Sequence, residues 1–289
     1  MVPAAELRRL GLAGLTGDAV RALVTRGTAP APGREGVMEL RRVKPEAFEA
    51  WVRAVTYGFG GRFHPEVMPD ERALLDLDRT LGWRDGDGWV AGASALPFTL
   101  SVPGGALPAT GVTAVAVLPT HRRQGLMTGL MERLLADARE RGDVVAALWA
   151  AESPIYGRFG FGMATPHRAL RSPVPTPPSA PTWPCPRAPR RPPRRCELGP
   201  RLAPLAERER ARRPGLPARD ERYWRHAQFG WEPDEIGERR VVVFEGPGSD
   251  EGYALHRVVE GHDDLTDLAD GRLQVEELVA LTPEAAIAL

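Results

Sequence analysis

The sequence predicts an α/β sandwich, and three consecutive features carry this prediction. Residues 111–118 are small and apolar, as in a strand, and the turn that follows, "THRRQG", is basic and contains a glycine. An amphipathic helix comes next, and then "DVVAALWA", whose continuous apolar run is typical of a buried strand. A strand, a crossover helix and a second strand form a βαβ unit, so the two strands are expected to be parallel.

The helix expected over residues 123–142 has one apolar face and one charged face. Helical spacing brings together Leu126, Leu130, Leu134 and Leu135, and Gly142 is a typical stop.

Upstream of this unit, the chain alternates between strand and helix patterns. A first strand is expected in "MELRRV", and residues 44–59 place Phe48, Trp51, Val52 and Val55 at helical spacing. Residues 69–83 suggest a second short helix. Residues 88–119 suggest three strands that are joined by glycine and proline turns.

Residues 172–199 are dense in proline and arginine, which excludes a regular helix or a central strand. A solvated linker is the simplest interpretation. Two alternatives stay open: a basic arm for nucleic acid, or the product of a frame slip in the gene. The arm would use Arg190, Arg191, Arg194 and Arg195, but no recognition fold lies nearby.

A second unit is expected after the linker. Helical patterns over residues 201–215 and 218–230 precede strand patterns over 239–246, 252–261 and 272–283. The final "VEELVALTPEAAIAL" repeats the order of strand, Thr, Pro and helix start found in "VTAVAVLPTHRRQGL", but without its arginines and glycine. We therefore expect a related α/β unit that lacks an anion site.

Composition narrows the class of protein. The 289 residues suggest two domains, and 38 basic against 38 acidic side chains give no net charge, so no overall field attracts nucleic acid or an anionic membrane. Two cysteines are too few for a disulfide framework or a zinc site, which fits a reducing cytoplasm.

We expect neither a metal nor a membrane span, and we expect residues 1–37 to be a flexible extension.

The basic turn suggests an anion site. Arg122 and Arg123 supply charge, Gly125 lets a phosphate approach the backbone, and the helix start offers unpaired N–H groups. Backbone N–H and C=O groups that are unpaired at the strand edge, at Val115 and Val117, can hydrogen-bond an extended, amide-bearing arm as if it were a further strand. A pyrophosphate with an amide arm is coenzyme A. A Walker phosphate loop is excluded because its lysine is missing, and a dinucleotide-binding fingerprint is excluded because two of its glycines are missing.

These residues resemble a known family. "VAVLPTHRRQGL", the helix, "VVAALWA" and "ESPIYGRFGFGMAT" are similar to the first domain of the enhanced intracellular survival proteins, which are multi-domain GCN5-related N-acetyltransferases (GNAT). The resemblance covers residues 112–165 and, more loosely, 201–289. It implies a mixed central sheet with flanking helices, followed by a second, incomplete GNAT-like unit. The superfamily motif would comprise Arg122, Gly125 and Met127, of which Met127 departs from the usual Gly or Ala.

The resemblance also implies site residues. Acetyl-CoA would be held by Val115, Ala116, Val117, Arg122, Arg123, Gln124, Gly125, Leu126, Met127, Thr128, Ala151 and Glu152. Tyr156 would be the general acid, and a phenol with a pKa near 10 can protonate a leaving thiolate. In the family, the carboxylate at the end of a third domain is the general base, and no position in these residues corresponds to it.

The expected domains are an extension at 1–37, an acetyltransferase domain at 38–170, a linker at 171–199 and a shortened second domain at 200–289. The expected function is transfer of acetyl from acetyl-CoA to an aminoglycoside, a polyamine or a lysine side chain. The alternative is a coenzyme A-binding protein without turnover. The resemblance also implies a homo-oligomer.

Overall fold

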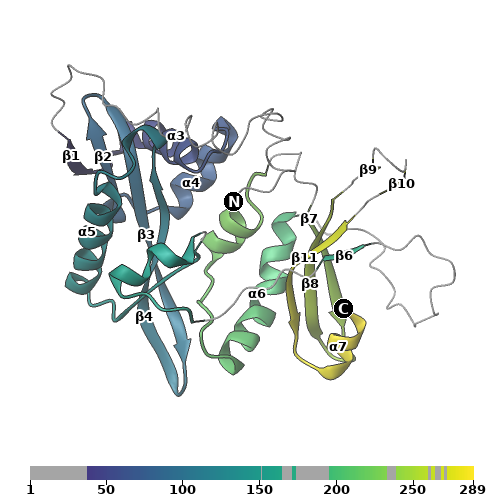
Figure 1. The fold of residues 1–289 in the computed structure, drawn as a ribbon. Coiled ribbons are helices and arrows are strands. Elements are labelled where there is room, and N and C mark those ends of the chain that lie inside the picture. Colours follow the sequence, from purple (N-terminus) through teal and green to yellow (C-terminus); the bar gives the residue numbers. More distant parts are fainter. Residues whose placement is uncertain are drawn as a thin grey trace.

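Two α/β domains lie side by side in the computed structural model of the chain (Figure 1). It describes residues 38–150, 152–164, 171–173, 195–232, 239–259, 262–263, 268–269 and 272–289. The expected extension at 1–37, most of the expected linker and Ala151 lie outside these residues. In the part of the chain that is described, no helix combines the length and the apolarity needed to cross a bilayer.

The first domain is built on a five-stranded sheet with the order β1-β2-β3-β4-β5. Its strands are β1 (Glu39–Arg42), β2 (Thr80–Asp85), β3 (Gly88–Val102), β4 (Gly105–Val117) and β5 (Val145–Leu148). The first four pair antiparallel, and β4 and β5 pair parallel. The sheet is therefore mixed, and the parallel pair is the βαβ unit expected from the sequence.

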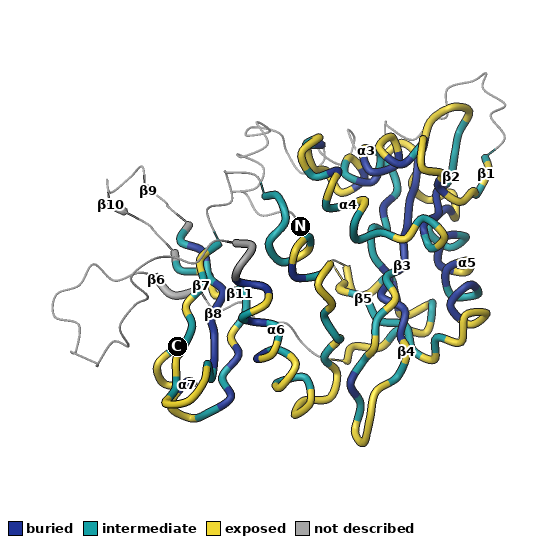
Figure 2. Tube along the Cα trace, turned by 180° about the vertical axis from the view of Figure 1, so that it is seen from behind, coloured by how far each residue is buried: buried dark blue, intermediate teal, exposed yellow. Residues whose placement is uncertain are grey.

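Helices cover both faces of this sheet, and each face has its own core (Figure 2). On one face lies α5 (Leu126–Glu140), which buries Leu126, Leu130, Met131 and Leu134. On the other lies α3 (Phe48–Gly58), which buries Phe48, Trp51, Val52 and Val55, the four residues expected from their spacing. The remaining helical segments are η1 (Pro45–Ala47), η2 (Pro65–Val67), α4 (Met68–Leu74), η3 (Leu77–Arg79), η4 (Pro119–His121), η5 (Ser153–Ile155) and η6 (Gly157–Phe159).

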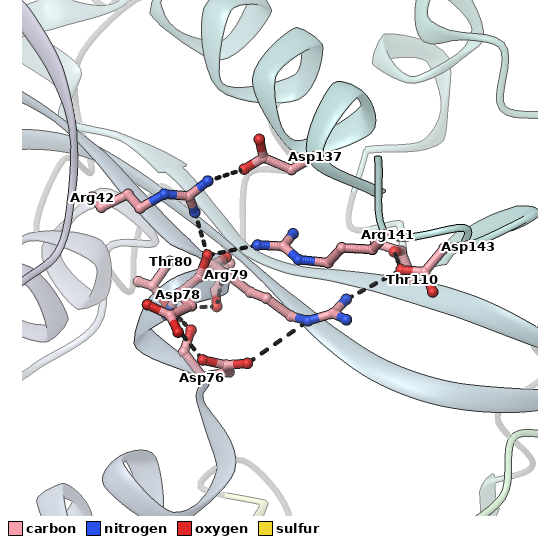
Figure 3. Close-up of polar contacts among 10 residues, drawn as sticks. Arg42, Asp76, Asp78, Arg79, Thr80, Thr110, Asp137, Arg141 and Asp143 are labelled. Carbon is pink, nitrogen blue, oxygen red and sulfur yellow. Dashed lines mark hydrogen bonds and ion pairs between the residues drawn. The ribbon is translucent and has the colours of Figure 1, made fainter. Parts of the chain in front are cut away.

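Ion pairs fix the C-terminal half of α5 to the sheet (Figure 3). Asp137, only 2% exposed, accepts from Arg42 at 2.8 Å and from Arg133 at 2.8 Å. After the helix ends, Asp143 accepts from Arg79 at 3.1 Å. These contacts lie at the opposite end of α5 from the basic turn, so they stabilise the helix without reaching its start.

The second domain has a four-stranded sheet with the order β6-β11-β8-β7. Its strands are β6 (Arg171–Pro173), β7 (Arg239–Glu245), β8 (Asp250–Val259) and β11 (Arg272–Ala280), and β9 (His262–Asp263) pairs separately with β10 (Leu268–Ala269). α6 (Arg195–Arg212) and the π-helical η7 (Tyr223–Gln228) pack on one face through Leu202, Leu205 and Trp224. α7 (Pro283–Ala288) begins directly after β11.

Two seams join the domains. The Ser101 hydroxyl near the end of β3 lies 2.9 Å from the carbonyl oxygen of Arg213 and 3.0 Å from that of Leu216, so its one hydrogen can reach either of them. Residues 215–218 add backbone bonds to β3. At the second seam, the Asp70 carboxylate of α4 accepts from His226 Nδ1 at 2.7 Å and from the Trp231 N–H at 2.6 Å. The second domain therefore contacts both the sheet and the α4 side of the first.

The structure corrects three sequence expectations in the first domain. Residues 88–119 form two long strands, not three. Pro97 stands where β3 pairs with β4 alone, and Pro108 stands just before β4 begins to pair with β5 at Ala109, so neither proline interrupts a ladder on both sides of its strand. The short helix expected over residues 69–83 ends at Leu74, and β2 begins at Thr80. The expected buried strand is β5, which is only half-buried because it is the outermost strand of the described sheet.

Both ends of the expected linker belong to the second domain. β6 pairs with β11, and α6 begins at Arg195, so a boundary at residue 200 falls inside a helix. Pairing at a sheet edge tolerates the proline of β6, because an edge strand leaves one side of its backbone unpaired.

Candidate functional site

β4 parts from β5 at the point where the sequence predicts free edge groups. The last pair of the parallel register joins Val112 to Leu148, whereas β4 continues to Val117. On its other side, β4 has a bulge in which Ala114 takes a positive φ of 55°. A bulge twists and bends its strand locally, so the end of β4 turns away from the line of β5.

The basic turn leads from β4 into α5. Arg123 and Gly125 both adopt left-handed backbone conformations, with φ of 64° and 80°. Gly125 is the N-cap of α5, and no side chain caps this helix end. The first intrahelical bond joins Gly129 N to Gly125 O, so the N–H groups of the first turn have no intrahelical acceptor. An uncapped N-terminus with the positive end of the helix dipole is suited to an anion.

The two arginines of the turn differ in their contacts. Arg122 donates from Nη2 to the carbonyl of Gly58 and from Nε to the carbonyl of Val117, both at 3.3 Å. Arg123 is exposed and has no hydrogen bond or ion pair among the described residues. Arg123 is therefore free to meet a phosphate, while Arg122 is engaged with the backbone of the protein.

The predicted general acid lies in the turn between η5 and η6. Tyr156 is 9% exposed, and its ring meets Phe161 edge-on at 6.0 Å between centroids. Burial first, and then the charge of Glu152, raise the pKa of the Tyr156 phenol above its usual value. The phenol therefore stays protonated at neutral pH, as a proton donor must.

The fold brings five of the predicted site residues into one hydrophobic cluster. Tyr156 and Leu126 are buried in the same core cluster, and Val115, Val117 and Met127 pack against it. The Ala116 side chain faces the other core, next to Gly58, so only its backbone is available to the site. Gln124 and Glu152 are exposed and Thr128 is half-buried.

Arg158 is a basic residue at this site that the sequence analysis missed. Its guanidinium lies 3.6 Å from the Met127 sulfur and 4.9 Å from the Phe159 ring centroid. It lies two residues after Tyr156 in "ESPIYGRFGFGMAT", and its charge beside the tyrosine is the signal in the sequence. Its position places a second cation beside the start of α5.

His121 in the same turn contacts two neighbouring side chains. Its Nε2 lies 3.2 Å from an Asp85 carboxylate oxygen, and its Nδ1 lies 2.8 Å from the Thr120 hydroxyl. It ties the basic turn to the end of β2.

The second domain has no equivalent anion site at the start of α7. The Thr282 hydroxyl accepts from Ala285 N at 3.2 Å and so caps that helix. It also lies 3.0 Å from a carboxylate oxygen of Glu251, whose negative charge opposes a phosphate.

Two family profiles match the chain. Both are described as an acetyltransferase (GNAT) domain, and they cover residues 39–164 and residues 215–289. The first match spans the first domain, and the second covers the part of the second domain that follows α6.

Curated relatives of the chain are also named N-acetyltransferases. An uncharacterized N-acetyltransferase of Streptomyces avermitilis is 35% identical over 231 residues, which are 78% of this chain and 52% of the relative. The N-acetyltransferase Eis of Mycobacterium bovis is 35% identical over 233 residues, which are 78% of this chain and 56% of the relative. The chain thus spans little more than half the length of these relatives.

Solved structures share the fold. Eis1 from Mycobacterium abscessus has a TM-score of 0.59 and 29% identity, and the match covers 88% of this chain and 61% of that one. A probable N-acyltransferase from Enterococcus faecalis has a TM-score of 0.63 with 18% identity over 87% of this chain and 60% of its own, and it supports the fold alone.

Proposed function

Because this chain belongs to the GNAT acetyltransferases, in the family of the enhanced intracellular survival proteins, we propose that it transfers an acetyl group from acetyl-CoA to a primary amine. One observation carries the proposal: the uncapped start of α5, the open end of β4 and the buried Tyr156 meet in one cluster. These are the parts that a pyrophosphate, an amide arm and a leaving thiolate require.

The residues present fit coenzyme A. The N–H groups of Leu126, Met127 and Thr128 would receive the pyrophosphate, with Arg123 and Arg158 beside it. The free edge of β4 from Val115 to Val117 would pair with the amides of the pantetheine arm. When bound, acetyl-CoA supplies a thioester that an amine can attack.

The chemical step follows from these positions. The amine nitrogen bonds to the thioester carbonyl carbon, the C–S bond breaks, and the sulfur leaves with the proton of the Tyr156 hydroxyl. An N–H group on the open edge of β4 can stabilise the negative charge on the carbonyl oxygen. The amine loses one proton to a carboxylate or water, and the Tyr156 phenolate then takes a proton back from that acceptor or from solvent, which restores the acid. The acceptor classes that we propose are aminoglycosides, polyamines and lysine side chains.

The test is release of free thiol from acetyl-CoA in the presence of these amines, together with calorimetric titration of coenzyme A. Amine-dependent release supports the proposed transfer. Binding without release from any amine would make the protein a coenzyme A-binding relative without turnover. Absence of binding would overturn the assignment of the turn before α5.

A further inference from the structure

Trp83 on β2 contacts the first turn of α5 in two ways. Its indole Nε1–H donates to the carbonyl of Leu126 at 2.9 Å. Its ring lies against Gly129, where an added Cβ would fall 2.8 Å from Trp83 Cζ2. Glycine at position 129 therefore makes room for the indole, and the indole holds the helix start from the side of the sheet.

The carbonyl that accepts this bond belongs to the same peptide unit as the Met127 N–H. In a trans peptide, the C=O and the N–H lie in one plane and point in opposite directions. A bond that fixes the Leu126 carbonyl therefore also fixes the direction of the Met127 N–H, which points toward the open N-terminal end of α5. A hydrogen bond at the carbonyl also polarises the peptide and strengthens its N–H as a donor.

We propose that Trp83 is a positioning residue for the cofactor: it orients the peptide between Leu126 and Met127 so that the Met127 N–H is set to receive the pyrophosphate. This inference rests on the proposed function of the same site. Trp83 itself does not touch the cofactor. Its effect is on the affinity for coenzyme A and not on the acetyl-transfer step.

Trp51 offers a matched control. Its Nε1–H also donates to a backbone carbonyl, that of Leu81, at 2.9 Å, but in the core on the other side of the sheet. Trp83→Phe and Trp51→Phe therefore each remove one indole N–H from a carbonyl, and only the first carbonyl is at the start of α5.

We expect Trp83→Phe to weaken coenzyme A binding about fivefold, the usual effect of one hydrogen bond, with kcat unchanged. Trp51→Phe lowers the melting temperature but leaves the dissociation constant for coenzyme A as in the wild type. Gly129→Ala, whose methyl displaces the indole, weakens binding as Trp83→Phe does. Equal affinities for Trp83→Phe and the wild type would overturn the inference.

A second measurement does not depend on coenzyme A. In the free protein, ¹⁵N relaxation reports the order parameter of the Met127 amide, and we expect Trp83→Phe to lower it while Trp51→Phe does not. An unchanged order parameter would refute the positioning role even if coenzyme A binds. Failure of the wild type to bind coenzyme A would refute the proposed function instead. If Trp83→Phe does not fold, 3-benzothienylalanine at position 83 removes the N–H and keeps the ring.

Discussion

Arg122 joins Gly58 at the end of α3 to Val117 at the end of β4, with a guanidinium hydrogen bond of 3.3 Å to each carbonyl. Gly58 lies against β4 so closely that an added Cβ would fall 2.8 Å from the Cβ of Ala116. The neighbouring Arg123 has no such contact. The two adjacent arginines of the basic turn therefore differ: Arg122 binds backbone carbonyls of the protein, and Arg123 extends into solvent.

Substitution of the two arginines should affect different quantities, coenzyme A binding for Arg123 and thermal stability for Arg122. Arg123→Ala is expected to weaken coenzyme A binding about two- to fivefold, the range of an exposed charge contact, and the loss should shrink as salt rises. Arg122→Ala is expected to lower the melting temperature by about 2–4 °C, because α3 loses its tie to β4. Calorimetry with coenzyme A and thermal unfolding measure the two effects. A larger loss of affinity in Arg122→Ala than in Arg123→Ala would contradict this division.

Tyr156→Phe tests the leaving-group acid. The substitution keeps the ring against Phe161 and removes only the hydroxyl. We expect kcat for thiol release to fall by about a hundredfold or more, because that is the usual contribution of a positioned proton donor. The dissociation constant for coenzyme A should stay within about twofold of the wild type. Phe161→Leu is a control for disturbed packing, and unaltered turnover in Tyr156→Phe would exclude the phenol as the acid.

The pH profile of kcat should reflect the raised pKa of the Tyr156 phenol. Burial and the charge of Glu152 raise the pKa of Tyr156, so the protonated, active form persists to higher pH than for an exposed tyrosine. We therefore expect the alkaline decline of kcat to lie at higher pH than the ordinary titration of an exposed tyrosine, because the protonated form is lost only as the pH passes the raised pKa. Glu152→Gln removes one cause of the shift and should move the decline to lower pH. A decline near pH 8 would point to another acid.

Asp70 should control the docking of the two domains. Its carboxylate takes hydrogen bonds from the His226 ring and from the Trp231 N–H, and the Trp231 ring also lies 5.0 Å from that of His64. Asp70→Ala removes both bonds and is expected to open this seam. Limited proteolysis between residues 213 and 232 should then be faster than in the wild type. Glu66→Ala, an exposed carboxylate on η2, is the matched control, and equal cleavage rates would contradict the role of Asp70.

Local sequence patterns determined the central elements. Helical spacing identified α3 and α5, because an amphipathic pattern has the same period as the helix. All four expected residues of α3 are buried, whereas in α5 the expected Leu135 is half-buried and Met131 is buried instead. The order of strand, basic turn, helix and strand identified the parallel pair of β4 and β5. It also predicted an anion site in the turn between them, which stays a prediction. These features depend on residues close together in the chain, so they are visible without a structure.

The division of the long β-region and the edge position of β5 were decided by tertiary pairing. Pro97 and Pro108 look like strand breaks in a sequence, yet each is tolerated where no second neighbour needs its N–H. In the same way, β5 has the apolar run of a buried strand but has β4 as its only partner in the described sheet.

What the sequence determined by itself was the βαβ unit, and from it the sequence predicted the residues of a site: the basic turn, the open strand and Tyr156. Only the tertiary structure decided which of these side chains reach the site. It showed that Arg122 binds backbone carbonyls of α3 and β4, that Ala116 faces the other core, and that Trp83, more than 40 residues before Leu126, holds the helix start. Such contacts join residues far apart in the chain, and they depend on strand register and helix packing, which local patterns do not specify.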